Sequence, residues 1–322
     1  MSSLDIPQVN FSGLDLSKVG TEEWLLARGQ VMKALETHGF FSVVFNKVPD
    51  ETLDALFGPL ADDLFSLPLE TKMLTTSDKF YQGYIPKRPG SNFESLNIDM
   101  VDASPLDSIQ RFVSLMWPHG NPTFRGMMWS FAREALELEM MVRRMVVEGL
   151  GVEKHFDESM VKSTVQSVRM FDYGAPSDQE KMMAMGSHQD MNIMTFIYQH
   201  HSDGLELQDK SGRWFRSSPN SFSIMIGESF EAWSNGRLKA TPHRVKMGSN
   251  NETRRSIGFG SAFKDECKIH APEDLVTEDH PLLYKPYHYD AYVQFRFSDA
   301  AKGSACPLKA YCGVLRGDEM VA

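Results

Sequence analysis

Apolar residues recur at helical spacing along the first half of the chain. Residues 21–37 and 50–66 each place apolar side chains on one face of a predicted helix, and a third predicted helix runs over 122–149. The short apolar run 40–45 lies between the first two helices and predicts a strand. The N-terminal half is therefore expected to be mainly helical.

From residue 165 onward, short apolar runs alternate with turn residues such as Asp203-Gly204 and Ser211-Gly212. Runs of this length and spacing are typical of an antiparallel sandwich or barrel. No segment of 20–50 residues repeats, which makes a propeller or a solenoid unlikely to fit this chain. The predicted strands are 165–173, 193–199, 205–208, 214–216, 222–226 and 256–263.

We expect one compact unit of 322 residues, because 42% hydrophobic content can bury a large core. Its expected parts are a helical and stranded N-terminal region (1–118), a long helix with its connection (119–164), a β core (165–266) and a C-terminal extension with a helix (267–322). Residues 76–118 are the least predictable stretch and are expected to form loops that could carry substrate contacts.

The strongest chemical signal is His188-Gln-Asp190, followed 55 residues later by His243. In an extended strand residues i and i+2 face the same side, so His188 and Asp190 can reach one ion. Two imidazoles and one carboxylate leave positions open on a catalytic metal. A His-x-Asp tripeptide alone is weak evidence, since three more begin at His155, His201 and His288.

The surroundings of His243 strengthen that interpretation. The Asn235-Gly236 pair before it predicts a hairpin turn, so that His243 would arrive on a strand paired near the first two ligands. Arg254 and Ser256 follow on one face of a strand. A guanidinium fork beside a hydroxyl suits a fixed carboxylate.

With these motifs in their order, the chain resembles plant-type 2-oxoglutarate- and Fe(II)-dependent dioxygenases of the isopenicillin N synthase-like superfamily, in particular the AOP-like branch of plant specialised metabolism. The likeness covers nearly the whole chain and implies a mainly β protein with flanking helices and a double-stranded β-helix (jelly roll) core. The segments that carry it are 6–11, 39–44, 67–72, 234–237, 243–245 and 254–256.

The resemblance implies that His188, Asp190 and His243 bind Fe(II), and that Arg254 and Ser256 anchor the distal carboxylate of 2-oxoglutarate. With O2 as the second co-substrate and ascorbate in a supporting role, such an enzyme oxidises a C–H bond and releases succinate and CO2. Hydroxylation, desaturation, cyclisation and demethylation all remain open. An intact aspartate at position 190 argues against halogenation.

Tyr173 is a further candidate for a 2-oxoglutarate contact. Relatives often carry Asn-x-Tyr on the strand before the His-x-Asp motif, whereas this chain reads Phe171-Asp172-Tyr173. The missing asparagine makes Phe171 an apolar residue at a position that is polar in relatives. Tyr173 could therefore either contact the co-substrate or pack in the core.

Strand parity extends the expected pocket. If Arg254 faces the cavity, Gly258 and Gly260 do so too, which predicts either a roomy pocket or a bulge. A bulky side chain at Gly260 would then block a large substrate. Arg169 shares a face with Phe171 and needs a carboxylate or a polar substrate group as its partner. The other candidate pocket residues are Tyr84, Phe93, Trp117, Met191, Phe230 and Trp233, each of which could instead pack in the core.

Composition narrows the partners. A net charge of −10 without a basic stripe excludes a general nucleic-acid binder, and no apolar run is long enough to span a membrane. The three cysteines, Cys267, Cys306 and Cys312, have no zinc-site spacing and an odd count, as expected in a reducing compartment. We expect a cytoplasmic monomer that acts on a small, partly apolar molecule.

Three other functions stay open from sequence. An oxidase of the same fold would use the Arg-x-Ser pair for its own substrate and consume no 2-oxoglutarate. A non-catalytic protein would only bind a small metabolite. A zinc hydrolase could use the same three ligands, because zinc competes well for imidazole, but it would leave Arg254 and Ser256 without a role.

Overall fold

Two β-sheets face one another in this computed structural model, which describes residues 6–79, 82–88, 93–101, 104–175, 183–247 and 252–314. The major sheet has the order β1 (Gln8–Asn10), β2 (Phe40–Val44), β9 (Ser221–Ile226), β6 (Met194–Gln199), β11 (Arg254–Phe263), β4 (Thr164–Tyr173) and β3 (Phe93–Met100). The minor sheet has the order β5 (Met183–His188), β10 (His243–Lys246), β7 (Leu205–Gln208) and β8 (Trp214–Arg216). This is the predicted mainly β architecture, a double-stranded β-helix with flanking helices.

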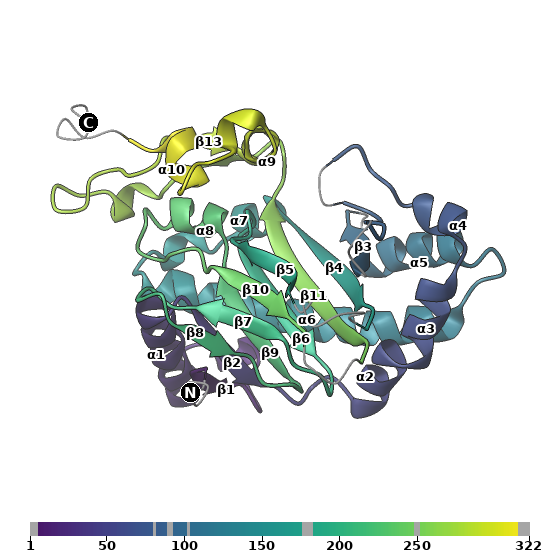
Figure 1. The fold of residues 1–322 in the computed structure, drawn as a ribbon. Coiled ribbons are helices and arrows are strands. Elements are labelled where there is room, and N and C mark those ends of the chain that lie inside the picture. Colours follow the sequence, from purple (N-terminus) through teal and green to yellow (C-terminus); the bar gives the residue numbers. More distant parts are fainter. Residues whose placement is uncertain are drawn as a thin grey trace.

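Helices cover the outer face of the major sheet, and Figure 1 shows the long helix α6 (Pro122–Gly149) running behind it. Helix α1 (Glu22–Thr37) packs on α6 and begins at Thr21, whose hydroxyl accepts a hydrogen bond from the backbone N–H of Trp24. Both helices match their predicted bounds to within one residue. Shorter helices include α4 (Leu69–Met73), α7 (Glu158–Lys162), α9 (Tyr289–Arg296) and α10 (Pro307–Cys312).

The predicted helix over 50–66 is in fact two helices, α2 (Asp50–Phe57) and α3 (Pro59–Ser66). Proline lacks the N–H that an unbroken helix would need at position 59. The carbonyl oxygens of Phe57 and Gly58 at the break accept hydrogen bonds from Arg255 Nη1, at 3.0 and 3.3 Å. Apolar periodicity continues across such a break, so the pattern alone could not reveal it.

Two further expectations were wrong. The Asn235-Gly236 pair does not join two strands: both residues have positive φ, 49° and 73°, and they follow the end of helix α8 (Glu228–Trp233). The stretch 76–118 is more regular than expected, because it contains β3 and α5 (Pro105–Met116). β3 pairs with β4 and extends the major sheet.

The main core lies between the major sheet and the helices, and its buried side chains come from Val9 through to Cys312. On β11, Ile257 and Phe259 join this core, so Arg254 and Ser256 face the opposite side, toward the minor sheet. The predicted parity of this strand is confirmed. The space between the two sheets holds these polar residues together with two small apolar clusters.

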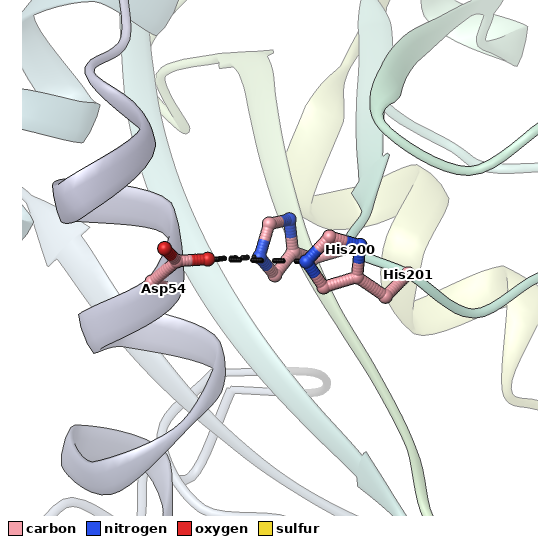
Figure 2. Close-up of side chains that lie close together, drawn as sticks. All are labelled: Asp54, His200 and His201. Carbon is pink, nitrogen blue, oxygen red and sulfur yellow. Dashed lines mark hydrogen bonds and ion pairs between the residues drawn. The ribbon is translucent and has the colours of Figure 1, made fainter.

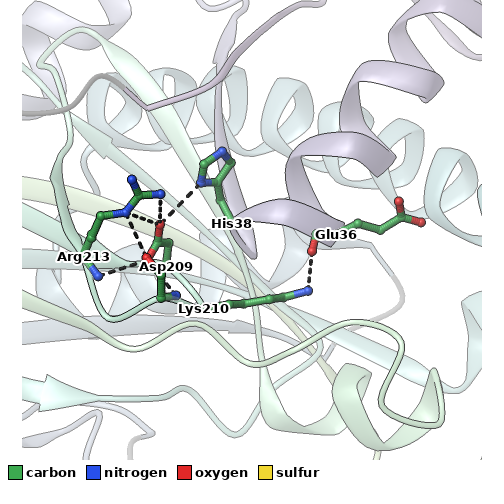
Figure 3. Close-up of polar contacts among 6 residues, drawn as sticks. Glu36, His38, Asp209, Lys210 and Arg213 are labelled. Atoms are coloured by element: carbon green, nitrogen blue, oxygen red, sulfur yellow. Dashed lines mark hydrogen bonds and ion pairs between the residues drawn. The ribbon is translucent and has the colours of Figure 1, made fainter.

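Polar contacts hold the β7–β8 hairpin of the minor sheet against the end of helix α1 (Figure 3). Asp209 accepts hydrogen bonds from Ser211 and from the Arg213 guanidinium, and lies 3.9 Å from His38 Nδ1. Lys210 donates to the carbonyl of Glu36 near the end of α1. These polar contacts fix the far edge of the minor sheet.

The C-terminal segment lies across one end of the two sheets (Figure 1) and includes a small ladder of β12 (Lys268–Ile269) and β13 (Tyr287–His288). Tyr292 on α9 donates a 2.7 Å hydrogen bond to Glu228 on α8. Burial raises the pKa of Glu228 to about 7, although the hydrogen bond from Tyr292 acts to lower it. Within the described ranges, no helix is both long and apolar enough to cross a membrane.

Candidate metal centre and co-substrate pocket

His188, Asp190 and His243 come together at the end of the minor sheet. His188 is the last residue of β5 and pairs directly with His243 on β10, while Asp190 lies just beyond the strand. The Asp190 carboxylate oxygens lie 3.7 Å from His188 Nε2 and 3.8 Å from His243 Nε2. One ligand atom from each residue falls within 4.8 Å of the others, as a shared metal ion requires.

Backbone carbonyls orient both imidazoles. His188 Nδ1 lies 2.9 Å from the Gly186 carbonyl oxygen, and His243 Nδ1 lies 3.1 Å from that of Thr241. Because a carbonyl only accepts, each Nδ1 carries the hydrogen and each Nε2 lone pair is left free. This is the tautomer that a metal ligand needs.

A hydrogen-bond chain that sequence reasoning missed holds the carboxylate. Thr195 on β6 donates a 2.5 Å hydrogen bond to Asp190 Oδ2, and Asn192 Nδ2 donates to the Thr195 hydroxyl at 2.8 Å. Thr195 can do so because it alternates with the core residues Met194 and Phe196 and faces the space between the sheets. The donor set therefore fits a ferrous ion: two oriented imidazoles, one braced carboxylate and open positions.

Arg254 lies deep between the sheets, with 3% of its surface exposed. Its guanidinium donates to Gln199 Oε1 at 2.6 Å, to the Asp203 carbonyl at 3.0 Å and to Ser256 Oγ at 3.3 Å. Among the described residues no carboxylate lies within ion-pair distance of it, and burial lowers its pKa. A buried cation without an anion is costly, so this site favours an anionic ligand.

Tyr173 lies beside Arg254 and close enough to Asp190 for that charge to act on its hydroxyl. It pairs with Arg254 across β4 and β11, and the guanidinium lies 4.9 Å from the centre of its ring. Burial raises the pKa of Tyr173, Arg254 lowers it through charge and a hydrogen bond, and the Asp190 charge raises it further. The hydroxyl therefore stays protonated and can donate to a ligand held by Arg254.

An aromatic wall continues from Tyr173 along the same face. Phe93 on β3 lies 5.0 Å from Tyr173 and 6.1 Å from Phe171, measured between ring centres. Arg169, next on this face, donates to Ser95 Oγ at 2.9 Å and to the Gly83 carbonyl at 3.2 Å. Its charge also acts on the half-buried Asp99, whose pKa is raised by partial burial although the Arg169 charge lowers it.

The glycines of β11 do not leave the wide space that was expected. A Cβ at Gly258 would lie 3.0 Å from the Phe171 ring and 3.2 Å from Ile197 Cδ1, so these side chains already occupy the space. A Cβ at Gly260 would lie 3.2 Å from Asn192 Nδ2. A large residue at position 260 would therefore disturb the support of Asp190 as well as any substrate.

Five of the candidate pocket residues belong to the main core or pack against it. Tyr84 donates a 2.7 Å hydrogen bond to Glu94, which faces the helices rather than the space between the sheets. Trp117 packs on Phe124 of α6, with ring centres 4.9 Å apart. These placements argue against the predicted pocket role, and the same holds for Met191, Phe230 and Trp233.

A cavity of about 370 Å³ opens beside His188, which forms part of its lining. Its walls come from the end of β5, from Pro242 and from the C-terminal segment, with Arg296 and Lys302 as its cations. His188 is the more exposed imidazole of the cluster, with 31% of its side chain accessible against 7% for His243. A small molecule can therefore approach the cluster from this side.

Two known protein families match this chain, one near its N-terminus and one in its β core. Residues 163–260 match the 2OG-Fe(II) oxygenase superfamily, and residues 6–106 match the N-terminal region of non-haem dioxygenases in morphine synthesis. A curated relative from Arabidopsis thaliana, named probable 2-oxoglutarate-dependent dioxygenase AOP1.2, is 35% identical over 317 residues. The match covers 96% of each chain.

Solved structures share the fold. The rice dioxygenase for auxin oxidation has a TM-score of 0.78 and 23% identity, with 96% of this chain and 100% of that one covered. The Arabidopsis thaliana dioxygenase for auxin oxidation 1, in a binary complex with 2-oxoglutarate, has a TM-score of 0.73 and 22% identity, with 86% and 99% covered.

Proposed function

Because the chain belongs to the 2OG-Fe(II) oxygenase superfamily, we propose that it is a dioxygenase that oxidises a C–H bond of a small organic molecule. Fe(II) is the cofactor, and 2-oxoglutarate and O2 are the co-substrates. One observation in the chain itself supports this best. A braced His-Asp-His cluster lies beside a buried arginine that lacks a carboxylate partner.

We assign iron binding to His188, Asp190 and His243, and the distal carboxylate of 2-oxoglutarate to Arg254 and Ser256. A ferrous ion held by these three residues would be chelated by the keto acid and would activate O2, which is the oxidant, while the keto acid would supply two of the electrons that O2 consumes. The protein's own groups do the positioning. Arg254 offers a fork of donors fixed by Gln199 and Asp203, and such a fork suits a planar carboxylate.

We place the primary substrate between the cluster and the aromatic wall formed by Phe93, Phe171 and Tyr173. Apolar walls with few polar groups favour a small, partly apolar molecule. Arg169 already has protein partners in Ser95 and Gly83, so its main role is to hold the segment around Gly83 against the sheet. Hydroxylation, desaturation, cyclisation and demethylation are all compatible with this arrangement.

The decisive experiment is anaerobic reconstitution with Fe(II), followed by addition of 2-oxoglutarate. A weak visible charge-transfer band is expected from the chelated keto acid, and admission of O2 should then release succinate. An oxidase of the same fold would bind Fe(II) without a band and would give no succinate. A non-catalytic binding protein would consume no O2 under any of these conditions.

Replacing Thr195 by valine should weaken Fe(II) binding by about 10-fold or more, the usual cost of removing a group that orients a metal ligand. The variant keeps the shape of the side chain but loses the hydroxyl that donates to Asp190. Anaerobic titration with Fe(II) at saturating 2-oxoglutarate measures the change. Thr195→Ser keeps the hydroxyl and should bind iron like the wild type; equal affinity in the valine variant would contradict the role of Thr195.

We further propose that the protein is a cytoplasmic monomer. The three cysteines are unpaired in the structure, which is consistent with a reducing compartment. Size-exclusion chromatography with light scattering tests the monomer, for which the expected mass is 36.5 kDa. Imaging of a fluorescent fusion tests the compartment.

A further inference from the structure

A second group of metal-binding side chains lies outside the site already described. Asp54 on helix α2 and the adjacent pair His200 and His201, at the end of β6, bring one ligand atom each within 4.8 Å of one another. His201 begins one of the spare His-x-Asp tripeptides of the sequence. Figure 2 shows both imidazoles directed at the Asp54 carboxylate.

The three side chains lie close enough to bind one ion after small shifts, although in the structure Asp54 and His200 share a hydrogen bond. Asp54 Oδ1 lies 2.8 Å from His200 Nε2 and 3.8 Å from His201 Nε2. Bonds of about 2.0–2.1 Å at a tetrahedral angle separate two ligand atoms by roughly 3.3 Å, and the two measured distances lie on either side of that value. A water molecule could take the fourth position because Asp54 and His201 are exposed, with 66% and 70% of their side chains accessible.

The backbone brings the two neighbouring histidines to the same side. Successive residues of a strand normally point in opposite directions, but His201 has a φ of 55°, in the left-handed region that few non-glycine residues adopt. The chain turns there, and the two imidazole rings lie with their centres 3.8 Å apart. This unusual conformation gives both Nε2 atoms access to Asp54.

The His200 ring and the backbone of His201 are held in place before any ion binds. His200 is 9% exposed at its side chain and packs against the ring of Phe57, with centres 5.2 Å apart. The backbone N–H of His201 donates to Asn220 at 3.0 Å. Arg254 also holds the chain before and after the two histidines, since its guanidinium donates to Gln199 and to the Asp203 carbonyl. Preorganised ligands lose little freedom on binding.

We propose that Asp54, His200 and His201 form a second, surface site for a borderline divalent transition-metal ion, with zinc as the most suitable probe. Two imidazoles and a carboxylate are ligands that zinc accepts. Asp50, one turn before Asp54 on helix α2, adds a second carboxylate near the two histidines. This local field attracts a cation.

Equilibrium dialysis of the iron-loaded protein, with 2-oxoglutarate and without O2, tests the site. The protein is dialysed against buffered Zn²⁺, and total bound iron plus zinc is counted by mass spectrometry. The wild type should hold about two metal ions per chain, and Asp54→Asn and His201→Ala should each hold about one. Both substitutions are at exposed positions, so the fold should survive, which a thermal melt verifies.

His155→Ala is the matched control, because His155 also pairs with an exposed carboxylate, Asp274, at 2.9 Å, and should still hold about two ions. About one ion in the wild type would show that the cluster is only an ion pair. Two ions in all variants would place the extra zinc elsewhere. Either result overturns the proposal but leaves the function at His188 and His243 intact, since that site contributes one ion, iron or zinc, to the total in every variant.

Discussion

The His243→Ala variant is expected to lose iron-dependent turnover, with activity reduced more than about 100-fold. Removing a group that merely supports a metal ligand already costs 10- to 100-fold, and His243 supplies one of only three protein ligand atoms in the cluster. The Asp190 carboxylate would also lose a neighbouring imidazole 3.8 Å away. Succinate release from 2-oxoglutarate under O2 measures turnover, and anaerobic titration measures bound Fe(II).

His270→Ala is the matched control for this experiment. His270 Nδ1 contacts the carbonyl two residues earlier at 3.1 Å, as His243 does, but on the exposed surface. It should retain full iron binding and activity. Because His243 is buried, His188→Ala provides a second, more exposed ligand variant with the same expected loss. Normal iron binding in both ligand variants would refute the metal centre.

Loss of the Arg254 guanidinium should raise the dissociation constant of 2-oxoglutarate by about 30-fold or more, because truncating one partner of a buried charge pair costs about 2–5 kcal/mol. Arg254→Met keeps most of the side-chain volume while removing the donors that Gln199 and Ser256 hold in position. The charge-transfer band, followed in an anaerobic 2-oxoglutarate titration, gives the dissociation constant. Fe(II) affinity without 2-oxoglutarate should change little.

The next residue along the strand provides the comparison. Arg255 points to the other face of β11, where it pairs with Asp62 at 2.6 Å and with Asp172 at 3.0 Å. Arg255→Met should therefore lower thermal stability but leave 2-oxoglutarate affinity nearly unchanged. If the two variants weakened 2-oxoglutarate binding equally, the effect would come from the strand rather than from the Arg254 guanidinium.

The elements best predicted from sequence are those whose pattern is local. Helix α6 has the predicted bounds because its apolar repeat is long and Pro122 starts it. The cluster of His188, Asp190 and His243 could be expected because ligand chemistry limits the residue types, and strand pairing then brings the two histidines into direct register.

The sequence could not show which face of a sheet a given side chain occupies. Phe93 and Tyr84 were equivalent aromatic residues in a stretch expected to be irregular, but pairing of β3 with β4 turns Phe93 inward and leaves Tyr84 bonded to Glu94 on the core side. Thr195 and Gln199 went unnoticed for a related reason. Polar residues at alternate positions of an otherwise apolar strand could have marked both of them as facing the space between the sheets.

The two sheets differ in how firmly they are supported. The major sheet rests on the main core, whereas the minor sheet packs on two small clusters, one around Phe40 and Phe215 and the other around Tyr173 and Val245. Regions with less buried apolar surface open first in native-state fluctuations. The imidazoles of His188 and His243 lie on the minor sheet, whereas the Asp190 carboxylate accepts a hydrogen bond from Thr195 of the major sheet. A bound metal ion therefore links the two sheets. Because the ion binds only the folded arrangement, it should slow amide hydrogen exchange in β5 and β10 far more than in β4.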